Sequence, residues 1–369
     1  MKKRIEILFL IGIVITSGIL FVHCSNKPVP DKIPDIPSAE KAVDIVLLYH
    51  GDVSRLAFTP DQIQHYVYRE KDGKTNWLFD GFLFVEFHVN IDGIDYDFEA
   101  INNRAQAEKK QWEVLLDKTF ENGKGPDALE EVLEGLARQG ITPPYKRKVV
   151  MAIPKPLPNK KDWGELNGRA LDFSKTEDRT QAVYWYIDRV LDIWKEKNYK
   201  HLELEGFYWT KEEVFVKDKD DDLMRAIKKK LGDKYEFSWI PYYGSPDAHD
   251  WKDYDFDIAY QQPNYFFEEA TPMEILMGAI AYADRHGLSL EMEFDAKLIT
   301  QKVFRDKYYA YIEEFRKDGA WDKKRITYYE GGDGWYKMAV SKDPEVIKAY
   351  DTLADILVKR KETLPVIVK

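Results

Sequence analysis

The chain has 369 residues, of which 44% are hydrophobic and 33% charged, so it is neither a disordered chain nor a multi-span membrane protein. The 55 Lys and Arg against 65 Asp and Glu give a net charge of −10, which argues against binding a nucleic acid through its phosphates. A single cysteine excludes a disulfide framework and a cysteine-based zinc site. Aromatic residues make up 14% of the chain, and any that reach a binding site would suit stacking against sugar rings.

The N-terminus has the pattern of an export signal. Residues 2–4 are positively charged, residues 7–22 are apolar, and the only cysteine, Cys24, follows directly after His23. This order is typical of a bacterial lipoprotein, so we expect residues 1–23 to be a signal peptide and Cys24 to carry the lipid. His23 stands where a small residue is usual, which leaves open an uncleaved signal anchor or an ordinary signal peptide cut nearby.

Residues 24–40 contain four prolines and few apolar residues, so we expect a stiff tether. The folded part should be one domain over residues 41–369. The expected location follows from these segments: export across the inner membrane, then lipid attachment at the outer membrane of the cell envelope, on a side that the sequence does not define.

After the tether, short apolar runs alternate with longer amphipathic stretches. The expected strands are residues 44–50, 79–87, 148–154, 201–209, 236–243, 258–267, 289–294 and 326–330. The expected helices are residues 104–122, 128–138, 178–197, 221–231, 273–286, 300–317 and 344–361. This alternation predicts an α/β fold, a (β/α)8 TIM-type barrel, with a doubly wound open sheet as the alternative. The connection after the fifth strand is too short for a full helix.

The sequence holds no pattern for a cofactor or a metal. The turn after the first strand offers one glycine, Gly51, where a dinucleotide or phosphate loop needs several. The charged run Lys217–Asp222 lacks the glycine and the final glutamate of a calcium loop. We therefore expect no cofactor and no metal, and we expect a monomer.

Strands four and seven carry carboxylates with a spacing of two. Glu291, Glu293 and Asp295 should share one face of strand seven, as Glu203 and Glu205 should share one face of strand four. Active sites of such barrels lie at the C-terminal ends of the strands. The carboxylates should therefore point into the barrel or its open end.

Paired carboxylates at this end suit glycoside hydrolysis, which needs one acid and one nucleophile or base. We assign Glu293 as nucleophile or base, Glu212 as general acid and Glu205 as the second choice for that acid. Structural roles are the alternative: Glu203 and Glu291, deeper in their strands, could pair with Arg or Lys from neighbouring strands, and Glu212 and Glu213 could begin a helix.

The expected substrate contacts lie near the same strand ends. Asn264 and Tyr265, with Gln262, would bind hydroxyl groups, and Trp209 and Trp239 would stack on the sugar ring. Further candidates for contact with the carbohydrate are Tyr242, Tyr243, Glu291 and His88.

Five motifs resemble one known family, domain-of-unknown-function family 4855. They are Phe79-Asp80-Gly81-Phe82-Leu83, Gly206-Phe207-Tyr208-Trp209 with Glu212, Trp239-Ile240-Pro241-Tyr242-Tyr243, Gln262-Pro263-Asn264-Tyr265 and Glu291-Met292-Glu293. The resemblance spans residues 43–361 and implies a barrel similar to glycoside hydrolases and a role in polysaccharide use. It implies importance for Glu212, Glu291 and Glu293, whereas Glu205 rests on position alone.

Three other functions stay open. A glycan-binding lipoprotein on a degenerate barrel would keep the aromatic residues and lack a converging acid pair. A polysaccharide lyase would need a tyrosine or histidine base and a cation for a uronate, which an acidic site disfavours. A structural lipoprotein would fill the end of the barrel with its own side chains.

Overall fold

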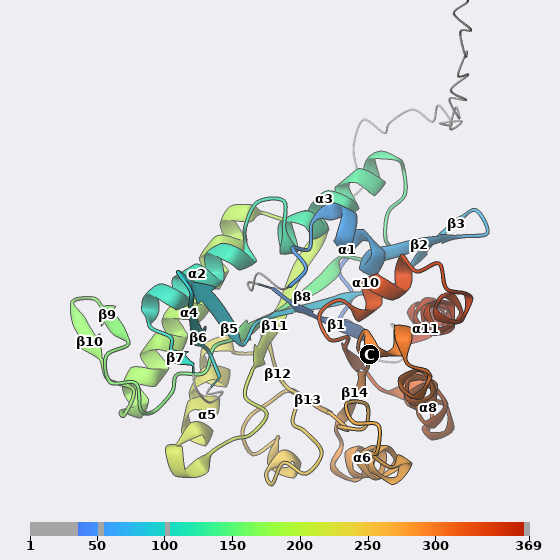
Figure 1. The fold of residues 1–369 in the computed structure, drawn as a ribbon. Helices are drawn as coiled ribbons and strands as arrows, with labels where there is room; N and C mark the ends of the chain where they lie inside the picture. Colours follow the sequence, from blue (N-terminus) through green and yellow to red (C-terminus); the bar gives the residue numbers. More distant parts are fainter. Residues whose placement is uncertain (1–35, 51–54, 100–103, 365–369) are drawn as a thin grey trace, which may run out of the picture.

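The computed structural model describes residues 36–50, 55–99 and 104–364 (Figure 1). The expected signal peptide, Cys24 and most of the expected tether lie outside the described residues. Within the described ranges, no helix is long and apolar enough to cross a membrane.

Eight parallel strands close into a barrel in the order β1-β4-β8-β11-β12-β13-β14-β15, with β15 pairing back to β1. They are β1 (Asp44–Tyr49), β4 (Gly81–Val85), β8 (Arg147–Ile153), β11 (Leu202–Trp209), β12 (Glu236–Trp239), β13 (Ile258–Gln261), β14 (Ser289–Glu293) and β15 (Ile326–Tyr329). The eight expected strands and the barrel are confirmed, and the open sheet is excluded. Strands β12 and β13 end earlier than expected because Pro241 and Pro263 follow them and have no N–H for a ladder.

Helices surround the barrel, as Figure 1 shows for α4, α5, α6, α8 and α11. The helices are α1 (Pro60–Val67), α2 (Lys109–Thr119), α3 (Gly125–Arg138), α4 (Thr176–Lys197), α5 (Asp220–Leu231), α6 (Met273–His286), α7 (Lys297–Thr300), α8 (Lys302–Asp318), α9 (Ala320–Lys323), α10 (Gly334–Ala339) and α11 (Pro344–Thr363). Between β12 and β13 the helical structure is only the short 3-10 turn η2 (Ala248–Asp250), as the length of that connection predicted.

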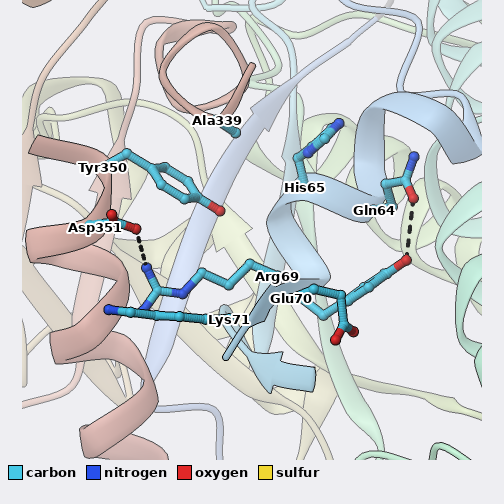
Figure 2. Close-up of a pocket in the computed structure, with 9 residues that line it drawn as sticks. Gln64, His65, Arg69, Glu70, Lys71, Ala339, Tyr350 and Asp351 are labelled. Atoms are coloured by element: carbon cyan, nitrogen blue, oxygen red, sulfur yellow. Dashed lines mark hydrogen bonds and ion pairs between the residues drawn. The ribbon is translucent and has the colours of Figure 1, made fainter. Parts of the chain in front are cut away.

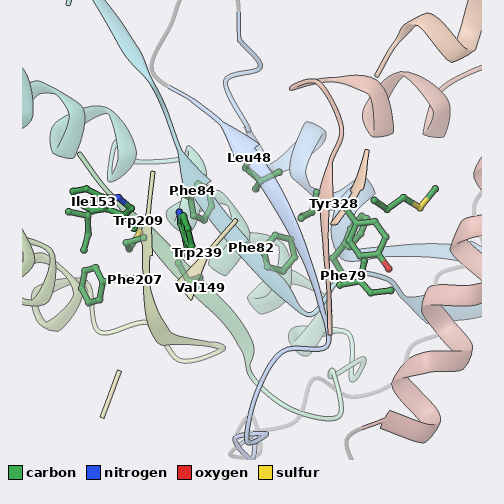
Figure 3. Close-up of a cluster of buried hydrophobic side chains, with 14 of the residues drawn as sticks. Leu48, Phe79, Phe82, Phe84, Val149, Ile153, Phe207, Trp209, Trp239 and Tyr328 are labelled. Atoms are coloured by element: carbon green, nitrogen blue, oxygen red, sulfur yellow. The ribbon is translucent and has the colours of Figure 1, made fainter. Parts of the chain in front are cut away.

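The strands alternate between two apolar clusters, because successive side chains point to opposite faces. Ile45 and Leu47 of β1 belong to a smaller cluster that fills the barrel, together with Leu83 and Val150. The intervening residues join the large cluster between the strands and the helices. Members of that outer cluster shown in Figure 3 include Leu48, Phe82, Phe84, Val149, Phe207 and Tyr328.

Three antiparallel hairpins are inserted between the barrel elements, and the sequence analysis did not expect them. They are β2 (Tyr68–Lys71) with β3 (Lys74–Trp77), β5 (His88–Ile91) with β6 (Ile94–Asp97), and β9 (Gly164–Leu166) with β10 (Arg169–Leu171). A short strand, β7 (Ala105–Gln106), pairs with β6. The hairpin turns are Asp72-Gly73, Asp92-Gly93 and Asn167-Gly168, and both residues of each turn have positive φ. Such pairs favour the two-residue turn that matches the twist of a hairpin.

Candidate functional site

Four glutamates form an acidic cluster at the C-terminal end of the barrel strands. Glu291 and Glu293 lie in β14, Glu212 follows β11, and Glu99 follows β6. Their charges act on one another: Glu99 and Glu293 both raise the pKa of Glu212, and Glu293 and Glu212 both raise the pKa of Glu291. The structure therefore brings Glu212, which follows strand four, close to Glu291 and Glu293 of strand seven.

Glu212 is the member that combines partial exposure with a strongly shifted pKa. Its side chain is half-buried, and burial raises its pKa to about 7, with the negative charge of Glu99 adding to the shift. Lys211 opposes it. The Ser245 hydroxyl donates to the Glu212 carbonyl oxygen at 3.3 Å, which ties this loop to the segment after β12. A carboxyl group with such a pKa can give and take a proton near neutral pH.

Glu291 lies inside the barrel and is only 2% exposed. The Thr327 hydroxyl of the neighbouring strand donates to its carboxylate at 3.2 Å. Burial first, and then the negative charges of Glu293 and Glu212, hold the pKa of Glu291 well above the ordinary range. Tyr49 and Tyr208 also lie within its electrostatic reach. The expected inward face of strand seven is confirmed, since Leu290 belongs to the outer cluster.

Glu293 is enclosed, with no exposed surface. Its two carboxylate oxygens accept the backbone N–H groups of Asn264 and Tyr265, both at 3.1 Å, and Glu293 also accepts the Tyr311 hydroxyl from α8. Burial raises its pKa to about 7, although these donors favour the charged form. Asn264 has a φ of 58°, which is a left-handed conformation. The hydrogen bonds from the backbone of Asn264 and Tyr265 to Glu293 therefore stabilise a strained turn after β13.

The expected hydroxyl-binding residues lie in the loop after β13, but in different surroundings. The Gln262 side-chain amide donates to the Asn264 side-chain oxygen at 3.0 Å, beside Glu293. Tyr265 is 6% exposed and packs against Tyr311, with the Lys307 ammonium 4.0 Å from its ring centre. The Tyr265 ring thus faces the outer helix α8, and its role in binding substrate hydroxyls stays a prediction.

Trp209 and Trp239 cannot stack on a sugar ring in this structure, because both are completely buried in the outer cluster. Trp239 lies parallel to Phe256 at 5.1 Å, and its indole N–H donates to the Lys211 carbonyl oxygen at 2.8 Å. The expected platforms are core residues: alternation along β11 and β12 turns both tryptophans toward the helices (Figure 3).

Glu205 lies at the opposite end of the barrel from the acidic cluster. An irregularity in β11 between Leu204 and Gly206 leaves Glu205 as an extra residue against β8. Glu205 forms an ion pair with Arg325, which precedes β15, and it accepts the Ala42 backbone N–H at 2.8 Å. The expected place of Glu205 near the catalytic end is corrected, because Glu205 lies four residues before the end of β11, level with residues that precede β1 and β15.

Aromatic residues that the sequence analysis did not assign form a row across the strand ends. The Tyr49 ring lies 5.6 Å from Phe87 and 5.7 Å from Tyr329, and Tyr329 lies 5.4 Å from Phe267. Phe87, Tyr329 and Phe267 are half-buried. Position at the end of a strand was the one signal that could have found Phe87 and Tyr329, while Phe267 lies in a loop without a motif of its own.

The remaining residues predicted to contact the substrate lie after strands β4 and β12. His88 Nδ1 lies 3.7 Å from a Glu86 carboxylate oxygen at the end of β4. The half-buried Tyr242 donates to Glu213 at 2.9 Å, next to Glu212. Tyr243 instead packs against Tyr282 of α6, with ring centres 6.0 Å apart. In the part of the chain that the structure describes, no three His, Cys, Asp or Glu side chains are placed to hold a metal ion.

Comparison with solved structures returns proteins of low sequence identity to this chain. An alpha-amylase from H. orenii has 8% identity and a TM-score of 0.45, covering 88% of this chain and 82% of its own. A chitinase from Bacteroides thetaiotaomicron has 12% identity and a TM-score of 0.44, covering 86% and 96%. The GH99 endo-alpha-mannosidase from the same organism has 10% identity and a TM-score of 0.42, covering 87% and 99%.

No curated protein matches the chain. A family model does match, over residues 44–355, and this range includes all eight barrel strands and the acidic cluster. The family carries the description "Domain of unknown function (DUF4855)", so it assigns no activity. The expected resemblance is confirmed: the chain belongs to the DUF4855 family.

Proposed function

We propose that this protein hydrolyses a glycosidic bond of a poly- or oligosaccharide, with Glu212 as the general acid. The observation that carries the proposal is the state of Glu212: it is half-buried at the C-terminal end of the barrel, and burial with the charge of Glu99 raises its pKa to about 7. A general acid must be protonated in the free enzyme and still give up its proton, and a pKa near the working pH serves both needs.

Glu293 is the proposed nucleophile or base. Three donors converge on its carboxylate, from Asn264, Tyr265 and Tyr311, and such donors favour the ionised form that this role needs. Because Glu293 is fully enclosed, the proposal requires the turn at Asn264 to move when substrate binds. A separation of about 5–5.5 Å between the two carboxyl groups would give retention of configuration, and about 6.5–9.5 Å would give inversion.

The row of Phe87, Tyr49, Tyr329 and Phe267 is the proposed support for the apolar face of the sugar ring. It takes the role that Trp209 and Trp239 cannot fill, since half-buried rings at the strand ends still present surface.

The test is incubation of the protein with a panel of poly- and oligosaccharides, with new reducing ends as the readout. Glu212→Gln and Glu293→Gln are compared with Glu213→Gln, a matched control whose carboxylate is bound by Tyr242. Release by the wild type and by Glu213→Gln, but by neither of the other variants, supports the proposal. Release by all four proteins would discard the residue assignment, and release by none would discard the hydrolase.

The enclosure of Glu293 favours a second candidate, a glycan-binding protein without catalysis. A carboxylate fully occupied in anchoring a turn needs no substrate, and Glu212 could then accept a sugar hydroxyl. Retention of the protein on an immobilised glycan, with no release of reducing ends from that glycan, would favour this function over hydrolysis.

The proposed location is a separate claim that rests on the sequence pattern alone. We propose that residues 1–23 direct export and that Cys24 anchors the protein to the cell envelope through a lipid. Metabolic labelling with a radioactive fatty acid should mark the wild type and not Cys24→Ser. Equal labelling of both proteins would contradict the anchor.

A further inference from the structure

A pocket lies outside the barrel, where α1, β2, α10 and α11 meet (Figure 2). Its volume is about 390 Å³, within the range of roughly 300–1,000 Å³ that is usual for small-molecule sites. Its lining includes Gln64, His65, Arg69 and Tyr350, and none of its lining residues belongs to the acidic cluster. It is therefore a separate feature of the molecule.

Arg69 lines this pocket with a buried side chain, and one of its hydrogen-bond donors has no partner among the described residues. Its side chain is 7% exposed, and its two terminal nitrogens bind Asp351 at 2.7 Å and Asp355. The remaining nitrogen, Nε, is buried and has no hydrogen-bond partner among the residues that the structure describes. A buried donor without a partner is unfavourable, so a ligand whose oxygen accepted a hydrogen bond from this nitrogen would be favoured.

The charges around Arg69 are already balanced. Lys71 binds Asp355 at 2.8 Å, and Asp351 occupies the other side of the Arg69 guanidinium. Glu70 adds a further negative charge to the lining. An anionic ligand would meet carboxylates without a free cation to offset them, so the electrostatics favour a neutral ligand.

The walls combine rings with polar tips. The Tyr350 ring lies 6.0 Å from the Arg69 guanidinium carbon, and in Figure 2 it extends from α11 over Arg69. Gln64 and His65 stand on the opposite side, on α1. Gln64 accepts the Tyr68 hydroxyl at 3.4 Å, and its side-chain NH2 donates to the Asp61 carbonyl oxygen at 3.1 Å, which leaves the second N–H of that group as a donor. Rings beside amide, imidazole and guanidinium groups match a molecule with both an apolar face and many hydroxyls.

We propose that this pocket binds one neutral sugar unit of a glycan, as a binding site separate from the acidic cluster. The neutral, hydroxyl-rich character of the ligand follows from the pocket itself. Its identification as a sugar rests on the proposed function. The site would hold a polysaccharide on the protein surface while the barrel end acts on it.

The experiment is calorimetric titration of the full chain carrying Glu212→Gln, so that bound glycan is not cleaved. The probes are the pentasaccharides of cellulose, starch, chitin and mannan, with a galacturonate pentamer as the anionic comparison. Addition of Gln64→Ala and His65→Ala should remove one binding site per chain, or weaken that site at least tenfold. Lys348→Ala, exposed on α11 and outside the lining, is the matched control and should change nothing.

Arg69→Met, checked for folding by thermal unfolding, should lose the same site. Binding that survives in all pocket variants would overturn the proposal, as would preference for the galacturonate or absence of binding by every probe. Hydrolysis of short oligosaccharides by the Gln64→Ala, His65→Ala protein with Glu212 intact separates the two claims. If no hydrolysis occurs but the pocket variants lose binding, the hydrolase fails and the pocket stands.

Discussion

The hydroxyl of Tyr311, on the outer helix α8, donates to the carboxylate of Glu293 at the end of strand β14. The same carboxylate accepts the backbone N–H groups of Asn264 and Tyr265. One buried side chain thus joins the outer helical layer, the barrel and the turn after β13. The position of this turn depends on an interaction that a substrate would have to rearrange.

Tyr311→Phe removes that hydroxyl and leaves the ring in place. The variant loses a buried hydrogen bond to a carboxylate. We therefore expect a loss of about 1.5–3 kcal/mol in the free energy of unfolding. Urea unfolding of the two proteins measures it. Tyr309→Phe, on the same helix, is the control, and a Tyr311→Phe effect no larger than that of the control would contradict the account.

Glu330 makes the stability of the protein depend on pH. It is fully buried at the end of β15, and burial raises its pKa from 4.5 to about 8. The folded state therefore keeps a proton that the unfolded state releases above about pH 4.5. The stability from this group is complete below that pH and is lost as the pH rises through 8, with a slope of about 1.4 kcal/mol per pH unit.

Glu330→Gln cannot ionise, so its unfolding free energy should fall less steeply with pH than that of the wild type. Glu212 and Glu293 contribute a decline of the same sign up to about pH 7 in both proteins, so the difference between the two curves isolates Glu330. Urea unfolding between pH 5 and 9 measures both curves. Parallel curves would show that Glu330 is not the group responsible.

Arg325 holds two carboxylates at the other end of the barrel, Glu205 and Glu236, the second at 2.7 Å. Arg325→Met leaves both acids buried without this cation, and we expect a loss of about 3–5 kcal/mol in unfolding free energy.

Glu205→Gln should leave the activity per folded molecule unchanged, because Glu205 lies far from the chemistry. A selective loss of kcat in Glu205→Gln, at normal stability, would restore it as a catalytic residue.

Phe267 tests the aromatic row. Its ring contacts Tyr329 and is half-buried, so Phe267→Ala should remove sugar contact without opening the core. We expect KM to rise about 2- to 12-fold with little change in kcat, since such a ring contact contributes roughly 0.5–1.5 kcal/mol. Phe266→Leu, which alters a buried neighbour, serves as the control for packing effects. An unchanged KM would remove the row from the substrate site.

The barrel could be predicted because its strands are continuous apolar runs separated by amphipathic helices. The inward side of β14 could also be predicted, since nothing interrupts the alternation from Leu290 to Glu293. The place of Glu205 was predicted wrongly, because Glu205 lies four residues before the end of β11 and pairs with Arg325 at the opposite end of the barrel. The bulge at Glu205, which the sequence does not mark, shifts the register of the later residues of β11 against β8.

Two other differences have distinct causes. The Asp-Gly pairs at Asp72 and Asp92 and the Asn-Gly pair at Asn167 are typical of hairpin turns, so the inserted hairpins could have been predicted from the sequence. The burial of Trp209 and Trp239 depends on helices that pack over them, which strand position alone does not reveal. Enclosure of Glu293 likewise depends on Tyr311, 18 residues further along the chain.

The most direct test of the central claim is the dependence of Glu212→Gln on the leaving group. Once the panel has identified a sugar, kcat/KM is measured on its natural oligosaccharide and on its dinitrophenyl glycoside. The dinitrophenolate leaving group departs without receiving a proton. We predict a loss of about 10²–10⁴-fold on the oligosaccharide and little loss on the activated glycoside. An equal loss on both substrates, or no loss on either, would contradict the role of Glu212 as the general acid.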